Sequence, residues 1–280
     1  MQDDRAPEFE VGVDMKTVRL QIHDSFFPRA KALRAAYDER FRDPLIPRAD
    51  RFIWDYWHIP GEYTLLRTQA HAFFQAKLYE SFHRHLVEWG RANLGCHDVS
   101  PPWLSCYVEG CRQEEHSDVP HGPLAFVFSL TGRRRFQGGE TFLKGEKNIP
   151  PKFNRLLVFN PAIPHGVTTV RGTHDPRFGR LVIHGWFVNP RPFWYGPLKA
   201  AEVSHAIEGG LLELGHLRLG QGFASFRLHI DRQGKVAQVK PLITTLEGCK
   251  DLPALMKTLR GLRFPKKKAS TQLTLPLMVD

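Results

Sequence analysis

The sequence contains few cysteines, no long apolar run and no export signal. Its four cysteines form no CxxC pair, so we expect free thiols in a reducing compartment and no disulfide scaffold or cysteine zinc site. The longest apolar run, residues 124–130, is seven residues long, against the ~20 that a membrane span requires. Residues 1–5 lack the basic-then-apolar order of a signal peptide. We therefore expect a cytoplasmic protein with no membrane partner.

Positive charge is concentrated in the last third of the chain. The net charge is +10, of which residues 191–280 carry +7 and residues 1–190 only +3. A basic surface of this kind either favours an acidic partner or is a solvated face, and the run Lys266–Lys268 is more typical of a solvated loop. Because residues 1–190 are nearly neutral and show no aromatic and basic strand for base stacking, a nucleic-acid substrate is disfavoured.

Helical spacing is confined to the first hundred residues, apart from one later segment. Residues 1–17 are polar, and we expect them to be ordered late or not at all. One helix is predicted after Pro28, and a longer one from Thr68, as its N-cap, to about Asn93, with Gly95 ending it. The aromatic-rich segment 52–60 between them either covers a pocket or packs in the core.

After residue 100 the pattern changes to short β-type runs separated by glycine and proline. Several short strands at regular spacing predict an antiparallel sandwich or barrel, with the preceding helices packed outside one sheet. The fold class is therefore mainly β with flanking helices. The predicted strands are 103–108, 124–130, 140–143, 155–159, 166–170 and 180–188.

A second, smaller α+β unit is predicted after the break at residues 189–192. A glycine-rich segment, 196–222, is expected to be a linker. Beyond it, the pattern predicts strands at 223–230 and 235–244, a helix at 251–262 and a last strand at 272–279.

The segment His116-Ser117-Asp118 precedes an apolar strand and carries candidate metal ligands. On extended backbone, side chains two residues apart lie on one face, so the imidazole and the carboxylate could bind one cation together. His165, which stands at a strand entrance, is the candidate third ligand. Two histidines and one carboxylate form the facial triad of non-haem Fe(II) oxygenases, although ligand type alone does not exclude Zn(II) or Mn(II).

Arg180 begins an otherwise apolar strand. Alternation places it on one face with Val182, His184 and Trp186. A guanidinium in such surroundings requires an anionic partner, and a carboxylate matches its donors best. If Arg180 faces the metal, its natural partner is the distal carboxylate of a dicarboxylate bound to that metal. Arg171 is a rival for this role.

Taken in order, five motifs of this region resemble the Fe(II)/2-oxoglutarate-dependent oxygenases, especially the prolyl-4-hydroxylase-like group. The resemblance covers roughly residues 100–190. The motifs are His116-Ser117-Asp118, Gly138-Gly139-Glu140-Thr141, Pro151 through Phe159, Pro164-His165-Gly166-Val167 and Arg180 through Trp186.

The resemblance implies a double-stranded β-helix, or jelly roll, with Fe(II) bound by His116, Asp118 and His165. It implies that Arg180 binds the C5 carboxylate of 2-oxoglutarate, that Tyr107 lines the cosubstrate pocket and that His184 assists the carboxylate. The implied cofactors are Fe(II), 2-oxoglutarate as cosubstrate and O₂, with ascorbate as a candidate stimulant.

The resemblance also assigns domains. We expect an oxygenase domain over residues 1–195, with helical support at 20–98 and a β-helix core at 100–190, and a second domain over 223–280. The motifs Phe226 through Val236, Leu262 through Pro265 and Leu275-Pro276-Leu277 resemble the C-terminal domain of TonB-like and AgmX-type proteins, which implies a protein partner.

The resemblance implies a dioxygenase that hydroxylates its substrate and releases succinate and CO₂. A peptidyl residue is the first substrate class, and a free amino acid or natural-product intermediate is the alternative. A catalytically silent β-helix that serves as a binding module is the rival from another class. The substrate is therefore expected to be a protein, a peptide or a small molecule.

Overall fold

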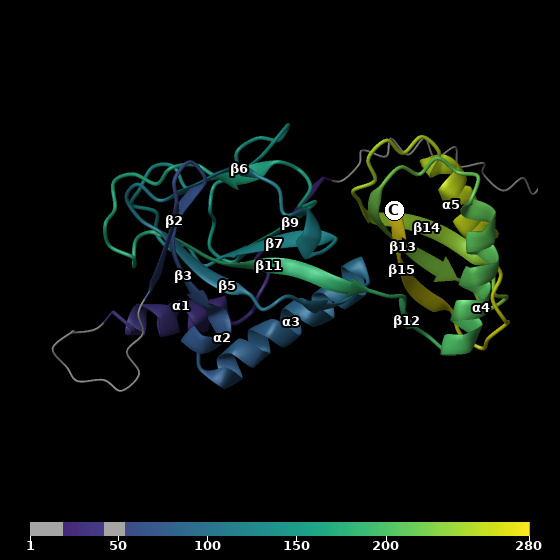
Figure 1. Cartoon of the computed structure of the whole chain (residues 1–280). Helices are drawn as coiled ribbons and strands as arrows, with labels where there is room; N and C mark the ends of the chain where they lie inside the picture. The colour runs from purple at the N-terminus through teal and green to yellow at the C-terminus, as the bar shows by residue number, and fades with distance from the viewer. Residues whose placement is uncertain (1–18, 42–53, 280) are drawn as a thin grey trace, which may run out of the picture.

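The computed structural model describes residues 19–41 and 54–279, which form two antiparallel sheets with helices around them (Figure 1). The expectation for residues 1–17, and residues 52 and 53 of the aromatic segment, lie outside the described residues. The helices are α1 (Ala30–Glu39), α2 (Ala70–Phe73), α3 (Ala76–Leu94), α4 (Ala200–Leu211) and α5 (Leu252–Gly261).

The larger sheet has eleven strands among the described residues and curls around a cavity. Its order is β1-β9-β7-β11-β5-β3-β6-β10-β8, with β2 beside β3 and β4 beside β11. The prediction of a mainly β jelly roll with flanking helices is confirmed. The strands are β1 (Leu20–Asp24), β2 (Asp55–Ile59), β3 (Tyr63–Gln69), β4 (Cys96–Val99), β5 (Trp103–Tyr107), β6 (Arg112–His116), β7 (Leu124–Ser129), β8 (Thr141–Leu143), β9 (Arg155–Phe159), β10 (His165–Val167) and β11 (Arg180–Pro190).

Strand β11 separates the two faces of this sheet by simple alternation. Leu181 and Ile183 point outward into the core that α1 and α3 share with the sheet. Arg180, Val182, His184 and Trp186 line the cavity, as the sequence predicts. In Figure 1 the three N-terminal helices lie together along one side of the sheet, which leaves its other side to the cavity.

The helix predicted from Thr68 begins later than expected. Residues 63–69 form β3, which pairs with β5 so that Thr68 faces Leu104, and the short α2 precedes α3. No side chain caps α3, whereas Gly95, at φ 73°, ends it as predicted. The strand pairing with residues distant in sequence decides the conformation of Thr68, and local capping does not.

The smaller sheet has the order β12-β15-β13-β14. Its strands are β12 (Phe193–Tyr195), β13 (Gly222–Ile230), β14 (Val236–Thr244) and β15 (Thr271–Val279). The segment predicted as a linker, 196–222, contains α4, whose Val203 and Ile207 are buried in the same apolar cluster as β13 and β15. Two of the glycines that suggested a linker, Gly209 and Gly210, thus lie near the end of a packed helix.

Helix α3 joins the two sheets. Its Ala92 carbonyl accepts hydrogen bonds from Arg227 Nη2 and from Thr274 Oγ1, the latter at 3.1 Å. Phe223 and Ile243 of the smaller sheet are buried in the core cluster of the larger one. Among the described helices none is both long and apolar enough to cross a membrane. All four cysteines are free, as predicted.

Candidate active site

Two histidines and one aspartate meet at the open end of β6. His116 and His165 are direct partners across the β6–β10 ladder. His165 Nε2 lies 3.5 Å from Asp118 Oδ2, and His116 Nε2 lies 3.8 Å from Asp118 Oδ1. One ligand atom from each of the three residues lies within 4.8 Å of the other two. The structure therefore brings together the three residues that the sequence proposes as ligands.

Asp118 reaches the cluster differently from the expected strand alternation. It lies beyond the end of β6, at φ −116° and ψ 36°, where the chain enters the 3-10 turn Val119–His121. Its backbone N–H donates to the Pro161 carbonyl at 2.9 Å. A turn anchored to a distant loop, and not a common strand face, directs the carboxylate toward the histidines.

Both imidazoles are held in the tautomer that metal binding requires. His116 Nδ1 lies 2.8 Å from the Glu114 carbonyl oxygen, and His165 Nδ1 lies 2.8 Å from the Ile163 carbonyl oxygen. A carbonyl can only accept, so each Nδ1 donates its hydrogen and each Nε2 faces the cluster. The Nε2 of His116 also lies 3.1 Å from the amide nitrogen of Gln113. This outer hydrogen bond is the usual partner of a histidine metal ligand, and the donor set fits Fe(II).

The carboxylate of Asp118 is ionised at neutral pH. Burial raises the pKa of Asp118, but the neighbouring His165 and His116 lower it by more, so it lies below the ordinary value. An anionic acceptor beside two imidazole nitrogens suits a divalent cation.

Gly166 allows β10 to approach β6 closely enough to place His165. A Cβ at this position would lie 2.4 Å from the Gln113 carbonyl oxygen and 2.5 Å from the Phe142 ring. No side chain larger than hydrogen fits between the two strands here.

Arg180 is buried in the cavity wall with donors that lack partners. Its side chain is 2% exposed, its Nη2 donates to Thr141 Oγ1 at 3.0 Å, and its guanidinium lies 4.6 Å from the centre of the Tyr107 ring. Among the described residues, Nε and Nη1 have no acceptor. Leaving such donors unpaired is costly, so this position is adapted to a ligand that brings the acceptor, and a carboxylate does so.

Tyr107 and His184 both line the cavity, at different depths. The Tyr107 hydroxyl donates to Gln113 Oε1 at 3.3 Å. His184 lies four residues beyond Arg180 on β11, and its Nε2 lies 2.8 Å from Ser105 Oγ. The rival Arg171 is exposed, pairs through its backbone with Gln137, and does not line the cavity.

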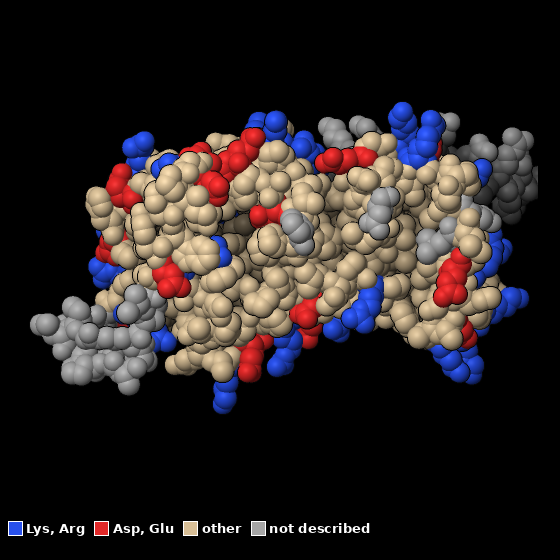
Figure 2. Space-filling view, viewed as in Figure 1, with Lys and Arg blue, Asp and Glu red and all other residues tan. Residues whose placement is uncertain are grey.

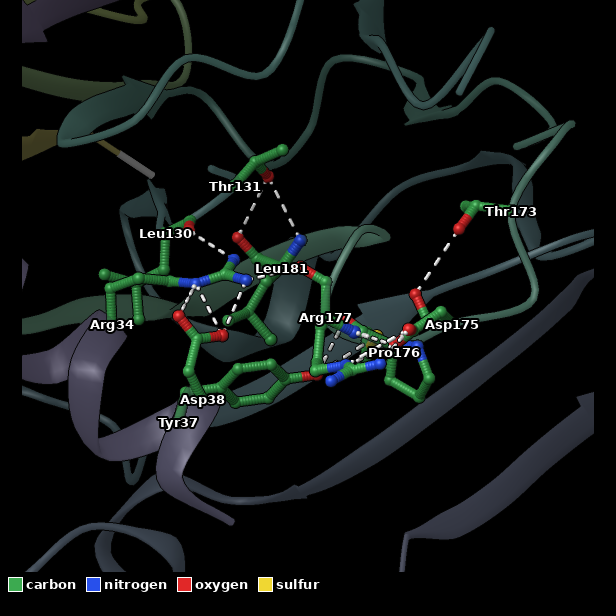
Figure 3. A network of polar contacts seen from close by, with 11 residues as sticks. Arg34, Tyr37, Asp38, Leu130, Thr131, Thr173, Asp175, Pro176, Arg177 and Leu181 are labelled. Atoms are coloured by element: carbon green, nitrogen blue, oxygen red, sulfur yellow. Dashed lines mark hydrogen bonds and ion pairs between the residues drawn. The ribbon is translucent and has the colours of Figure 1, made fainter. Parts of the chain in front are cut away.

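Helix α1 braces the segment that leads into Arg180 (Figure 3). Arg34 donates through Nη1 to the Leu130 carbonyl at 3.1 Å and through Nη2 to the Arg177 carbonyl. The Tyr37 hydroxyl donates to the Pro176 carbonyl at 3.0 Å. The helix thus fixes the loop that precedes Arg180 against the end of β7.

The cavity has a volume of about 920 Å³ and extends from Arg180 past the His–Asp–His cluster to an aromatic mouth. Figure 2 shows this face of the larger sheet hollowed, with acidic and basic groups interspersed around it, whereas basic groups gather around the smaller sheet. Sequence reasoning missed the three residues of the mouth, Trp57, Arg67 and Trp103. Trp57 belongs to the segment for which a pocket cover and core packing were both left open, and it lines the cavity.

We compared the chain with known families and with solved structures. Residues 102–188 match the model of the 2OG-Fe(II) oxygenase superfamily. A prolyl-4-hydroxylase from Pseudomonas putida is 21% identical, with 61% of this chain and 92% of that chain covered and a TM-score of 0.42. A prolyl hydroxylase from Trichoplax adhaerens, in complex with a hypoxia inducible factor peptide fragment, is 14% identical, with 61% and 83% covered and a TM-score of 0.43. No curated protein matches the chain.

Proposed function

We propose that this protein hydroxylates a peptidyl residue. The proposal starts from the 2OG-Fe(II) oxygenase domain that the chain carries, which makes the protein an oxidoreductase that uses Fe(II), 2-oxoglutarate and O₂. The observation that carries this proposal is the meeting of His116, Asp118 and His165 in one cavity with the unpaired donors of Arg180. The volume of about 920 Å³ is near the upper end of the ~300–1,000 Å³ typical of small-molecule sites. It leaves room for a residue of a polypeptide beside the cosubstrate.

We assign the roles as follows. His116 and His165 bind Fe(II) through Nε2, and Asp118 binds it through its carboxylate. Arg180, oriented by Thr141 and stacked on Tyr107, binds the distal carboxylate of 2-oxoglutarate. His184 forms part of the wall near the mouth, and its hydrogen bond to Ser105 supports this position in place of a direct contact with the carboxylate.

The reaction combines substrate R–H, 2-oxoglutarate and O₂ to give R–OH, succinate and CO₂. Bound Fe(II) supplies the redox chemistry that activates O₂. The chain holds the remaining parts in place: the Nδ1–H groups of the two histidines fix ring orientation, and Arg180 neutralises the cosubstrate at a buried site.

The smaller sheet is proposed as a second unit that begins near Arg191, because β12 pairs with β15 and α4 packs in its core. Its likeness to TonB- and AgmX-type domains supports a protein-binding role. A cytoplasmic location stays a prediction from the sequence.

The test is release of succinate with and without Fe(II). We expect Fe(II)-dependent release from the unaltered protein, its loss in His116→Ala and Arg180→Ala, and its retention in His205→Ala, an exposed histidine on α4. Equal release by all four proteins would contradict the proposal and favour a catalytically silent module. A search for enzyme-dependent +16 Da products among lysate proteins and metabolites then decides between a peptidyl substrate and a free amino acid.

A further inference from the structure

The mouth of the cavity contains an arginine held between two tryptophans. The guanidinium carbon of Arg67, on β3, lies 3.7 Å from the centre of the Trp57 ring on β2 and 3.8 Å from that of Trp103 on β5. All three side chains line the cavity. The two indole planes are inclined at 63° and their centres lie 5.8 Å apart, so the rings flank the guanidinium from two sides without covering both of its faces. Part of the guanidinium therefore stays open to the cavity.

Among the described residues, the guanidinium of Arg67 makes no hydrogen bond and no ion pair. Arg67 Nε is buried without an acceptor, and no carboxylate of the described residues lies within ion-pair distance of the guanidinium. Asp55, which faces Arg67 across the β2–β3 hairpin, acts on it only at longer range. An unpaired buried donor costs about 1–3 kcal/mol, and a ligand that brings an acceptor into the cavity would recover that cost. The arrangement is that of a preformed anion site.

The anion is not one of the ends of 2-oxoglutarate. Arg180 supplies free donors for the distal carboxylate, and the metal ligands occupy the other end of that molecule. Arg67 pairs with Ser105 on β5, and Ser105 pairs with Val182, two residues along β11 from Arg180. The two arginines therefore stand two strands apart and two residues out of register, about 10 Å across the sheet and about 7 Å along it. We assign them to two different anions.

We propose that Arg67 binds a carboxylate of the primary substrate and thereby positions the substrate over the His–Asp–His cluster. This inference rests on the proposed function, and it narrows the substrate class to molecules that carry a carboxylate near the target carbon. That carboxylate is a chain terminus, an acidic side chain or the free group of an amino acid, and the site distinguishes it from a neutral amide.

The test uses the full-length protein loaded with Mn(II) and 2-oxoglutarate, so that binding is measured without turnover. The probes are the N-acetyl derivatives of the twenty amino acids, as free acids and as amides. The amides of aspartate and glutamate are grouped with the acids, because their side chains carry carboxylates. Binding is followed by tryptophan fluorescence, since Trp57 and Trp103 stack on Arg67.

We expect the acids that bind to do so at least about tenfold more tightly than the corresponding amides, the effect of one charge-assisted hydrogen bond. Arg67→Met should abolish this preference. Arg67→Lys, which keeps the charge but not the planar group, should reduce it. The matched control is Arg135→Met, because Arg135 also lies over an aromatic ring, Phe178, at 4.2 Å but outside the cavity.

Three results of the binding assay would each overturn the inference: amides that bind as well as acids, an unchanged preference in Arg67→Met, or no acid binding at millimolar concentration. A weaker affinity for 2-oxoglutarate itself in Arg67→Met would also overturn it, because it would assign Arg67 to the cosubstrate. Succinate release by the Fe(II) protein is measured in parallel. If that release is Fe(II)-dependent while the acids show no preference, only this inference fails and the proposed function stands.

Discussion

His184 on β11 and Ser105 on β5 are joined by a hydrogen bond across the cavity wall, with imidazole Nε2 2.8 Å from the hydroxyl oxygen. Withdrawal from bulk water lowers the pKa of His184 from 6.5 to about 3. The charged groups that face it are Arg67 and Arg180, which lower the pKa further, Asp118, which raises it, and His116, which lowers it. The imidazole of His184 is therefore neutral at any pH well above 3.

The first prediction concerns stability in acid. Between pH 6.5 and about 3, the unfolded chain binds a proton at His184 that the folded chain does not, so stability falls as the pH falls through this window. His184→Gln can keep a hydrogen bond to Ser105 and removes the titration. The free energy of unfolding of His184→Gln, measured in urea at several pH values, should fall less steeply with falling pH than that of the unaltered protein. The difference in slope should be a fraction of the about 1.4 kcal/mol per pH unit that one proton represents. An unchanged slope in His184→Gln, or an equal change in the exposed His205→Gln, would contradict this account.

The second prediction is that Arg180 is needed for cosubstrate binding and not for the stability of the fold. Its buried Nε and Nη1 donors lack acceptors, and replacing such a group by an apolar side chain of similar shape is neutral or stabilising. Arg180→Met should therefore be as stable as the unaltered protein or more stable, by up to about 3 kcal/mol, in the absence of 2-oxoglutarate. Thermal unfolding with and without the cosubstrate provides the measurement. Stabilisation by 2-oxoglutarate should appear in the unaltered protein and be absent from Arg180→Met.

The third prediction concerns the brace between α1 and the loop before Arg180. Arg34→Met removes the bonds to the Leu130 and Arg177 carbonyls and should destabilise the fold by about 1.5–3 kcal/mol. Because the loop positions Arg180, the KM for 2-oxoglutarate should rise more than kcat falls. The control, Asp38→Asn, removes only the exposed ion pair with Arg34, which contributes about 0.5 kcal/mol or less. Equal effects of the two variants on KM would show that α1 does not act through the loop.

The fourth prediction uses two glycines in opposite surroundings. Gly166→Ala places a methyl group 2.4 Å from the Gln113 carbonyl oxygen. It should separate β10 from β6, which lowers stability by about 1–3 kcal/mol and weakens Mn(II) binding. Gly209→Ala, on α4, meets nothing within 4 Å and should raise stability by about 0.5–1 kcal/mol. Urea unfolding and Mn(II) titration of both variants check the signs, and a destabilising Gly209→Ala would count against the described conformation of α4.

The parts of the fold that the sequence predicts well are those in which local pattern and tertiary environment agree. The strand from Arg180 was expected because it is a mostly apolar β-type run, and its two faces in the structure are the core and the cavity. The helix from Thr68 was partly wrong, because β3 gains its stability from β5, more than thirty residues away. Helix α4 was missed because Gly209 and Gly210 lower its apparent propensity, while burial of Val203 and Ile207 stabilises it.

The candidate site shows the same division. His116, Asp118 and His165 could be proposed because their residue types and order suit one metal ion. The grouping of Trp57, Arg67 and Trp103 could not be proposed. These three residues lie on three different strands and are up to 46 positions apart in the sequence. Nothing in the sequence near Arg67 indicates that Trp103 will cover it, because only the closure of β3 on β5 brings the two together.

The carbonyl of Ala92, near the end of α3, has one last implication. It accepts hydrogen bonds from both β13 and β15. The smaller sheet is therefore attached directly to α3 and is not connected through a flexible linker alone. A macromolecule bound to that sheet would be held at one fixed distance from the cavity and in one fixed orientation. Lengthening the chain between β11 and β12 would leave that orientation unchanged as long as the hydrogen bonds to the Ala92 carbonyl are kept.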